Sequence, residues 1–521
     1  MKHNFFEKLM GIADRIGVYL LGFVAVVLNI TLAFDNVVWG DEAYSQMAII
    51  NTDAYGVYQR VYYWDSHPPF YYYYLKFVAD IFGYKTPVYH FASLIPFIIG
   101  IVFACTLIKK HLGTIPAIFF ILISGFSESC VEYNLEIRMY SLVFMLVLLC
   151  LCYAFLIVKG ESKTIYYVLM TLFGVLAAYT HYYGLALCGL IIFFAGLFNV
   201  IHEKRKKNKI RGTVISWILS TIIYIVVYIP WLFVLYAQTQ AELSNSWMTE
   251  PAPFSQVLTF ITGGARLKPV MLTVVVLMTI YIILDEFGVI PFGKKEEKKE
   301  DRKFSADFIC LLFMYIVIAG LLLFGYVVSY AFHPILAFRY TYVLIPPVLF
   351  IFMICVRRFV MIFFPESNGN FTDEKKKIPS PKFGKGATIL GSGVTILLLL
   401  LVMILSLLDF KYFRSLTKTQ DFQTNRVLET IGTPNPEAIM CANGVKHLAW
   451  SVLRYYYDNE VSSDNPNNIT NDAPEFWAFV GYEYDDEVIA DMEYRGYIVE
   501  SYKDMWLGKY GINLYHFIRT W

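Results

Sequence analysis

Long apolar runs separated by short polar segments dominate the first 410 residues of the chain. A transmembrane helix needs about 20 mostly apolar residues to cross about 30 Å of hydrocarbon. The pattern predicts eleven such helices, at residues 17–35, 90–108, 113–126, 139–158, 165–181, 184–200, 213–236, 270–290, 305–330, 341–356 and 388–408. The third run is short and the ninth is long, so a tilted or re-entrant segment would change the count most at these two.

The pattern changes after the last run, where short apolar and polar segments alternate. Their periodicity predicts helices at 422–431, 445–457 and 486–495, and strands at 438–442, 476–482, 497–502 and 512–518. About 110 residues are enough for a small domain to bury its own core. We therefore expect a polytopic α-helical membrane domain (1–410) followed by a small C-terminal α/β domain (411–521).

The composition agrees with a membrane protein. Of the 521 residues, 57% are hydrophobic and 16% are charged, which is more apolar and less charged than a soluble domain. A soluble enzyme is thereby excluded. The net charge of +1 gives no reason to expect a nucleic-acid partner.

The distribution of basic residues predicts the orientation. If the N-terminus is cytoplasmic, the segments on that side hold most of the 43 Lys and Arg residues, and the outer loops hold few. We therefore expect an integral protein of the plasma membrane, in which the loop at 36–88 and the C-terminal domain are extracytoplasmic.

The loop at 36–88 carries Asp41, Glu42, Asp65 and His67 where the chain has just left the bilayer. A cavity at a membrane face raises the basicity of carboxylates and strengthens their interactions with cations. Adjacent Asp41 and Glu42 cannot face the same way on a helix, so one can point at a substrate while the other caps backbone donors. A solvated pair that caps a surface helix is the alternative.

Three further segments place charged groups at the same face. Glu128, Glu132 and Glu136 are four residues apart, on one face of a helix with Arg138 beside it, and could bind a metal or a phosphate or form a salt-bridged surface. Neither of the other two candidates has a single interpretation. His181 is an interfacial histidine or a hydrogen-bond partner of a phosphate, and Arg339 reaches lipid phosphates or forks onto the phosphate of a donor.

Four motifs together resemble a known family. WGDEAYS (39–45), DSHPPFYYYYL (65–75), EIRMYSL (136–142) and FRYTYVLIPPVL (338–349) occur in the order, and at the membrane face, of the GT-C superfamily of membrane glycosyltransferases. The resemblance is strongest to the branch that holds the protein O-mannosyltransferases and the lipid A aminoarabinose transferases. It covers roughly residues 15 to 410.

The resemblance implies transfer of a sugar from a polyprenyl-phosphate-linked donor to a hydroxyl of an acceptor glycan, lipid or protein. It implies inversion at the anomeric carbon, with Asp41 as general base and Glu42 either orienting the acceptor or supporting Asp41. The substrate-binding positions that it implies are Asp65, His67, Glu136, Arg138, Tyr140, His181, Arg339 and Tyr340. Membrane lipids are the other expected partners; no cofactor is certain, and a divalent cation is possible because metal use varies in the superfamily.

Other functions stay open at this point. A transporter or flippase for lipid-linked sugars would need charges near the bilayer midplane and related halves, whereas the predicted helices are nearly free of charge and show no repeat. An oligosaccharide ligase or polymerase would keep the fold and use a diphosphate-linked donor. A non-catalytic membrane scaffold is the remaining alternative.

Overall fold

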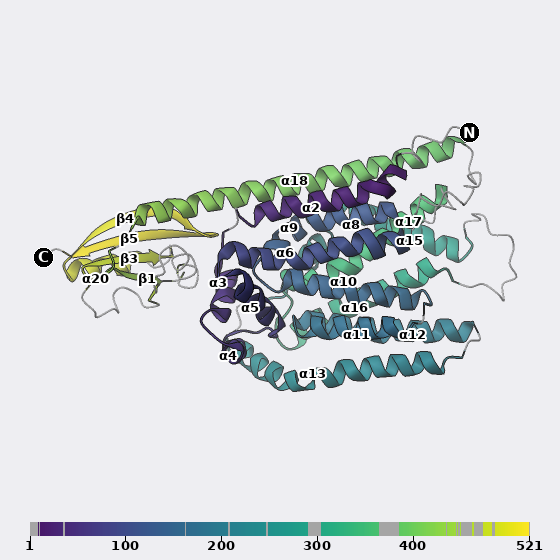
Figure 1. Ribbon diagram of the computed structural model, residues 1–521, viewed down its shortest axis with the longest axis horizontal. Helices are drawn as coiled ribbons and strands as arrows, with labels where there is room; N and C mark the ends of the chain where they lie inside the picture. The colour runs from purple at the N-terminus through teal and green to yellow at the C-terminus, as the bar shows by residue number, and fades with distance from the viewer. Residues whose placement is uncertain are drawn as a thin grey trace.

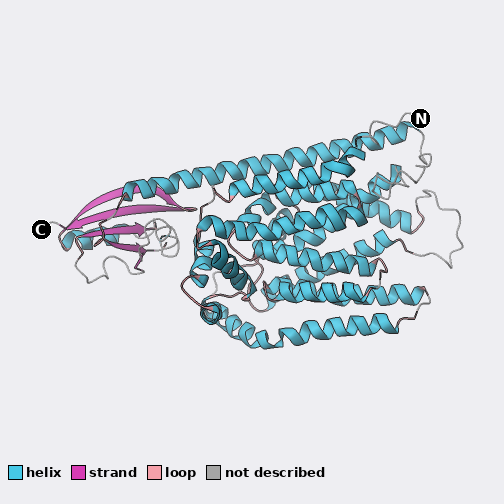
Figure 2. Ribbon diagram, in the orientation of Figure 1, coloured by secondary structure: helices cyan, strands magenta, loops and turns pink. Residues whose placement is uncertain are grey.

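A computed structural model gives the arrangement of the chain. It describes residues 9, 11–34, 37–161, 163–206, 209–245, 248–289, 304–363, 385–433, 435–443, 445, 449, 461–462, 473–481 and 485–519. Helices make up almost all of the described structure, and strands occur only near the C-terminus (Figure 2).

Nine helices of the described residues are long and apolar enough to cross a membrane. Their bounds are Ala13–Leu32 (η1 and α2), Thr86–Leu112 (α6, η2 and α7), Tyr140–Val158 (α10), Tyr182–Arg205 (α12), Arg211–Ala241 (in α13, Arg211–Asn245), Lys268–Glu286 (α15), Ala306–Ala331 (α16), Phe338–Phe363 (η4 and α17) and Ile389–Ile431 (in α18, Lys385–Ile431).

The predicted count of eleven is higher than the nine that the structure describes. The third predicted helix is α8 (Thr114–Phe126), which meets α9 (Glu128–Leu135) at a 62° bend, and this pair makes ten if it counts as one broken span. The fifth is α11 (Thr164–Ala178), whose 15 residues rise about 22 Å, less than the thickness of the hydrocarbon. An apolar run alone does not show whether the helix that it forms is long enough to cross the membrane.

The helix α10 lies at the centre of the bundle. It contacts α6, α11, α12, α16 and α17, and 94% of the residues in its 18-residue apolar stretch are buried. The outer helices α2, α13 and α18 bury only 28% of theirs, as expected of helices whose apolar side chains face lipid. One continuous apolar core joins the whole bundle.

Three short helices cover one end of the bundle: α3 (Gly40–Ile49), α4 (Ala54–Trp64) and α5 (Phe70–Phe82) (Figure 1). They fill the predicted external loop. Asp53 begins α4 because its carboxylate accepts a hydrogen bond from Gly56 N at 2.8 Å. The two prolines before α5 interrupt the chain, and Phe70 N then donates to Tyr179 O at 3.0 Å, which fixes the start of α5 against the bundle.

The helix α18 is 47 residues long and runs from the bundle into the C-terminal sheet without a break at residue 410 (Figure 1). The sheet has the order β2-β1-β3-β5-β4. Its strands are β1 (Ile439–Asn443), β2 (Val461–Ser462), β3 (Glu475–Val480), β4 (Tyr497–Leu507) and β5 (Tyr510–Arg519). The first three pair in parallel, and β3–β5–β4 pair antiparallel.

Most of the predicted elements of this domain are present. The strands β1, β3, β4 and β5 and the helix α20 (Asp485–Tyr494) lie within a few residues of the predicted bounds, and the predicted helix at 422–431 is the end of α18. The two-residue strand β2 was not predicted, and the helix predicted at 445–457 lies outside the described residues except for residues 445 and 449. The end of α18 packs on one face of the sheet, and α20 packs on another apolar cluster.

Candidate active site

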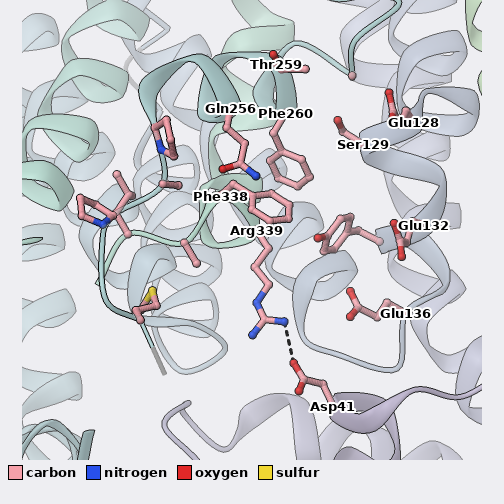
Figure 3. Close-up of a pocket in the computed structure, with 18 of the residues that line it drawn as sticks. Asp41, Glu128, Ser129, Glu132, Glu136, Gln256, Thr259, Phe260, Phe338 and Arg339 are labelled. Carbon is pink, nitrogen blue, oxygen red and sulfur yellow. Dashed lines mark hydrogen bonds and ion pairs between the residues drawn. The ribbon is translucent and has the colours of Figure 1, made fainter. Parts of the chain in front are cut away.

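A cavity of about 1080 Å³ lies between the start of α3, α9, the helix α14 (Phe254–Ile261), the start of the 3-10 helix η4 (Phe338–Leu344) and the turn between β4 and β5. Figure 3 shows part of its lining. The charged residues of the lining that the structure describes are Asp41, Glu128, Glu132, Glu136, Glu250, Arg339 and Lys509. The cavity therefore has an acidic wall and two basic side chains.

Asp41 and Arg339 form an ion pair on the wall of this cavity (Figure 3). Arg339 Nη1 donates to Asp41 Oδ2 at 2.9 Å, and the two side chains are 20% and 32% exposed. Asp41 lies in the first turn of α3, and Arg339 lies in η4, 298 residues later. A carboxylate and a guanidinium that both face the same cavity provide a proton acceptor beside a cation.

Glu42 has a different environment, although it is adjacent to Asp41. It is only 1% exposed and is not part of the cavity lining. Its Oε2 accepts a hydrogen bond from Trp39 N at 3.1 Å, and its Oε1 accepts one from Ile137 N at 2.9 Å. Glu42 therefore caps the N-terminus of α3 and ties it to the loop after α9, which is a structural role.

Glu136, which directly follows α9, also contacts the residue that precedes α3. Its Oε1 accepts a hydrogen bond from the indole of Trp39 at 3.0 Å, and it lines the cavity. Burial, together with the nearby carboxylate of Glu42, raises the pKa of Glu136 to about 8. The Glu136 carboxyl is therefore mostly protonated at neutral pH.

Asp65, His67 and Arg138 form a buried cluster with Tyr72 behind the cavity. His67 Nδ1 lies 2.8 Å from Asp65 Oδ1 and 3.5 Å from Arg138 Nη2, and the Tyr72 hydroxyl donates to Asp65 and accepts from Arg138. Burial alone would raise the pKa of Asp65, but His67, Arg138 and Tyr72 together hold it well below its ordinary value. Asp65 is therefore an ionised member of this network.

His181 lies between this cluster and η4. Its ring centroid is 5.2 Å from that of His67 and 5.3 Å from that of Tyr340, and its Nδ1 accepts a hydrogen bond from Tyr183 N at 3.0 Å. Burial, with the charge on His67 and Arg138, lowers the pKa of His181 far below its ordinary value. Among the described residues, His181 Nε2 and the Tyr140 hydroxyl have no hydrogen-bond partner although both are buried.

Of the predicted site residues, Asp41, Glu136 and Arg339 line the cavity together. The others form a buried polar layer next to it: Glu42, Asp65, His67, Arg138, Tyr140, His181 and Tyr340. The Arg339 guanidinium, 5.7 Å from the centroid of the Tyr340 ring, joins the two groups. Residues from four distant segments of the chain thus meet at one place.

Trp39 and Lys509 also line the cavity, although neither was predicted from the sequence as a site residue. Lys509, from the turn between β4 and β5, donates from Nζ to Glu132 Oε1 at 3.0 Å, and lies 5.8 Å from the centroid of the Trp39 ring. Trp39 lies two residues before the acidic pair, within the motif WGDEAYS, and this position was a usable signal. Nothing near Lys509 in the sequence resembles a site motif.

The three glutamates of α9 and the following loop do not form a metal site in the described part of the chain, where no group of three or more His, Cys, Asp and Glu side chains is arranged to hold a metal ion. Glu132 pairs with Lys509. Glu128 Oε2 accepts a hydrogen bond from Ala265 N at 3.1 Å.

Comparisons with known proteins give the fold. No protein-family model and no curated protein matches this sequence. Among solved structures, ArnT from Cupriavidus metallidurans in the apo state is 13% identical, with a TM-score of 0.52, over 96% of this chain and 97% of that chain. The same protein bound to undecaprenyl phosphate is 12% identical, with a TM-score of 0.48, over the same shares of the two chains. The chain therefore has the fold of apo ArnT, as its motifs predicted for residues 15–410. The small C-terminal sheet is the one that the periodicity after residue 410 predicted.

Proposed function

We propose that this chain is a membrane glycosyltransferase that moves a sugar from a polyprenyl-phosphate-linked donor to an acceptor hydroxyl at the extracytoplasmic face. The observation that carries the proposal is the ion pair of Asp41 and Arg339 on the wall of a cavity of about 1080 Å³. Ligand cavities are typically about 300–1,000 Å³, so this cavity has room for a sugar and part of an acceptor. The fold of ArnT supports the assignment.

In the proposed reaction, the acceptor oxygen attacks the anomeric carbon of the sugar while the bond from that carbon to the phosphate oxygen breaks. The acceptor proton goes to the Asp41 carboxylate, and the bonding electron pair leaves with the polyprenyl phosphate. A single displacement of this kind inverts the anomeric centre and needs no nucleophile from the enzyme. General base catalysis of this kind contributes about 10²- to 10⁴-fold.

Arg339 would bind the phosphate while it stays close to Asp41. A guanidinium has five N–H donors in a planar fork, so it can contact a carboxylate and a phosphate oxygen at the same time. The Tyr140 hydroxyl and His181 Nε2 are buried next to it without hydrogen-bond partners among the described residues. They are suited to complete the phosphate site as further polar contacts.

The test uses the purified protein in nanodiscs with a panel of polyprenyl-phosphate-linked sugars and a mixture of acceptors. The measurement is release of free polyprenyl phosphate together with formation of the glycosylated acceptor. Release that depends on an acceptor supports the proposal. If the donor is moved between leaflets but never consumed, the protein is a transporter and the proposal is wrong.

A further inference from the structure

The turn between β4 and β5 brings a lysine from the C-terminal domain into the cavity. Lys509 Nζ lies 3.0 Å from Glu132 Oε1 of α9 and 5.8 Å from the centroid of the Trp39 ring. The next residue, Tyr510, lies against the first residue of α3, since its hydroxyl is 3.4 Å from the position of a Cβ on Gly40. Lys509 and Tyr510 therefore contact both α9 and the start of α3.

The position of this turn is fixed by α18, which also contacts the acidic wall. The backbone nitrogen of Gly508 donates to Thr424 Oγ1 of α18 at 3.0 Å. Nearer the bundle, Asp409 Oδ2 of the same helix accepts a hydrogen bond from Glu128 N, at the start of α9, at 3.1 Å. One helix thus holds Lys509 and its partner α9 in fixed relation, so the contact is part of the fold.

Trp39 lies between Lys509 and Asp41, the proposed general base, and links the two. Its ring lies 5.8 Å from both Lys509 Nζ and the Arg339 guanidinium carbon. Its indole donates to Glu136, and its backbone nitrogen donates to Glu42. Asp41 follows two residues later, so a shift of Trp39 would redirect the Asp41 carboxylate.

Lys509 also balances the charge of the acidic wall. The described lining includes five acidic side chains, of which Glu136 is mostly protonated at neutral pH, and only one other cation, Arg339. The positive charge on Lys509 lowers the pKa of Glu136, against the larger effects of burial and Glu42. Its own pKa would be lowered by burial, but Glu132, Glu42 and Glu136 raise it above its ordinary value, so it stays protonated.

We propose that Lys509 is a positioning residue of the active site, which holds Trp39 and Glu132 in place and thereby fixes the start of α3 and the direction of Asp41. The C-terminal domain is then part of the catalytic unit and not an appended module. The catalytic part of this inference rests on the proposed function, whereas the positioning of α3 does not.

The first test measures positioning without any substrate. Hydrogen–deuterium exchange of the amides at 39–45 is compared in the full-length wild type, Lys509→Gln, Lys509→Arg and the control Lys503→Gln. Lys503 is an exposed lysine on β4, the strand that precedes the turn of Lys509. We expect exchange several-fold faster in Lys509→Gln, with wild-type rates in Lys503→Gln and largely restored protection in Lys509→Arg. Equal rates in all four proteins would overturn the inference.

The second test measures sugar transfer against pH. The described charged and titratable groups that act on Glu136 or are affected by it are Glu42, Glu132, Tyr133, Arg138, Tyr140, Arg339, Tyr342 and Lys509. Removing the Lys509 charge should raise the pKa of Glu136, so the limb of the pH profile that Glu136 controls should move to higher pH in Lys509→Gln. The misdirected base should also lower kcat by up to about 100-fold.

The outcomes separate this inference from the proposed function. If the wild type transfers no sugar, the proposed function fails, and the exchange experiment still decides whether Lys509 positions α3. If the wild type is active and Lys509→Gln has the pH profile and kcat of Lys503→Gln, Lys509 has no positioning role and the inference is wrong.

Discussion

Glu42 Oε1 lies 2.9 Å from the backbone nitrogen of Ile137, 95 residues further along the chain. The residue next to the proposed base therefore joins α3 to the loop that follows α9. Its other carboxylate oxygen caps α3. The two neighbouring acids thus have separate tasks, one in the cavity and one in the scaffold.

The two acids should respond differently to the same amide substitution. Glu42→Gln replaces a charged acceptor of two buried backbone N–H groups, which should cost about 1–3 kcal/mol of unfolding free energy. Asp41→Asn should leave stability nearly unchanged, since Asp41 is partly exposed. Thermal unfolding of both variants in the same detergent measures this, and equal melting temperatures would show that Glu42 does not support the scaffold.

Asp41→Asn should lower sugar transfer by about 10²- to 10⁴-fold, because an amide cannot accept the proton of the acceptor. Binding of the polyprenyl-phosphate donor should persist, since the phosphate and the tail supply most of that affinity. The experiment measures transfer and donor binding on the same preparation. Near-normal transfer would show that Asp41 is not the general base.

Arg339→Lys keeps the positive charge but loses the planar fork. We expect donor binding about 10-fold weaker or more, as one charged hydrogen bond to phosphate is lost. Titration of the donor against the variant and the wild type measures the change. An unchanged dependence on donor concentration would assign Arg339 to lipid phosphates instead.

The raised pKa of Glu136 predicts a dependence of stability on pH. Its pKa is about 8 in the folded protein and 4.5 ordinarily, so between these values the folded state binds more protons than the unfolded state. The free energy of unfolding should therefore fall as the pH rises from about 4.5 to about 8. Glu136→Gln should lack this part of the slope. The measurement is the melting temperature of the variant and the wild type from pH 5 to 9. The same dependence of melting temperature on pH in both proteins would contradict the raised pKa of Glu136.

The predicted orientation can be tested by cysteine labelling, because all eight native cysteines are buried. An impermeant thiol reagent should label Asn51→Cys and Ser501→Cys in intact cells, since both lie on the predicted outer side. Lys204→Cys, on the predicted cytoplasmic side, should react only after the membrane is opened. Protection of the first two would reverse the orientation and place the cavity in the cytoplasm.

Much of this site could be predicted because its residues lie in short segments at the ends of apolar runs. Asp41 and Arg339 are 298 residues apart, yet both lie where a transmembrane helix meets the same face, and the basic residues predict which face that is. In a membrane protein, the predicted ends of the transmembrane helices thus show which residues lie at the same face, and the sequence of a soluble protein gives no such information. The division of roles between Asp41 and Glu42 also follows from their positions in the first turn of a helix.

Lys509 could not be predicted in the same way. Its approach to Glu132 depends on the length of α18, the pairing of β4 with β5 and the packing of the sheet on the helix. No local pattern encodes such a contact. The lengths of the helices were also hard to predict, since α8 and α11 are as apolar as membrane helices but shorter than the nine long ones.

The unbroken course of α18 limits how the chain can change in length. A helix turns by about 100° and rises 1.5 Å with each residue. Because Thr424 holds Gly508 beside Lys509, adding a single residue to α18 between Asp409 and Thr424 would swing the whole sheet around the helix axis and carry Lys509 away from Glu132. The helix therefore fixes both the distance and the rotation between the bundle and the sheet. Relatives of this protein that keep the lysine contact should have no insertions or deletions between these two positions, whereas other parts of the chain can vary in length.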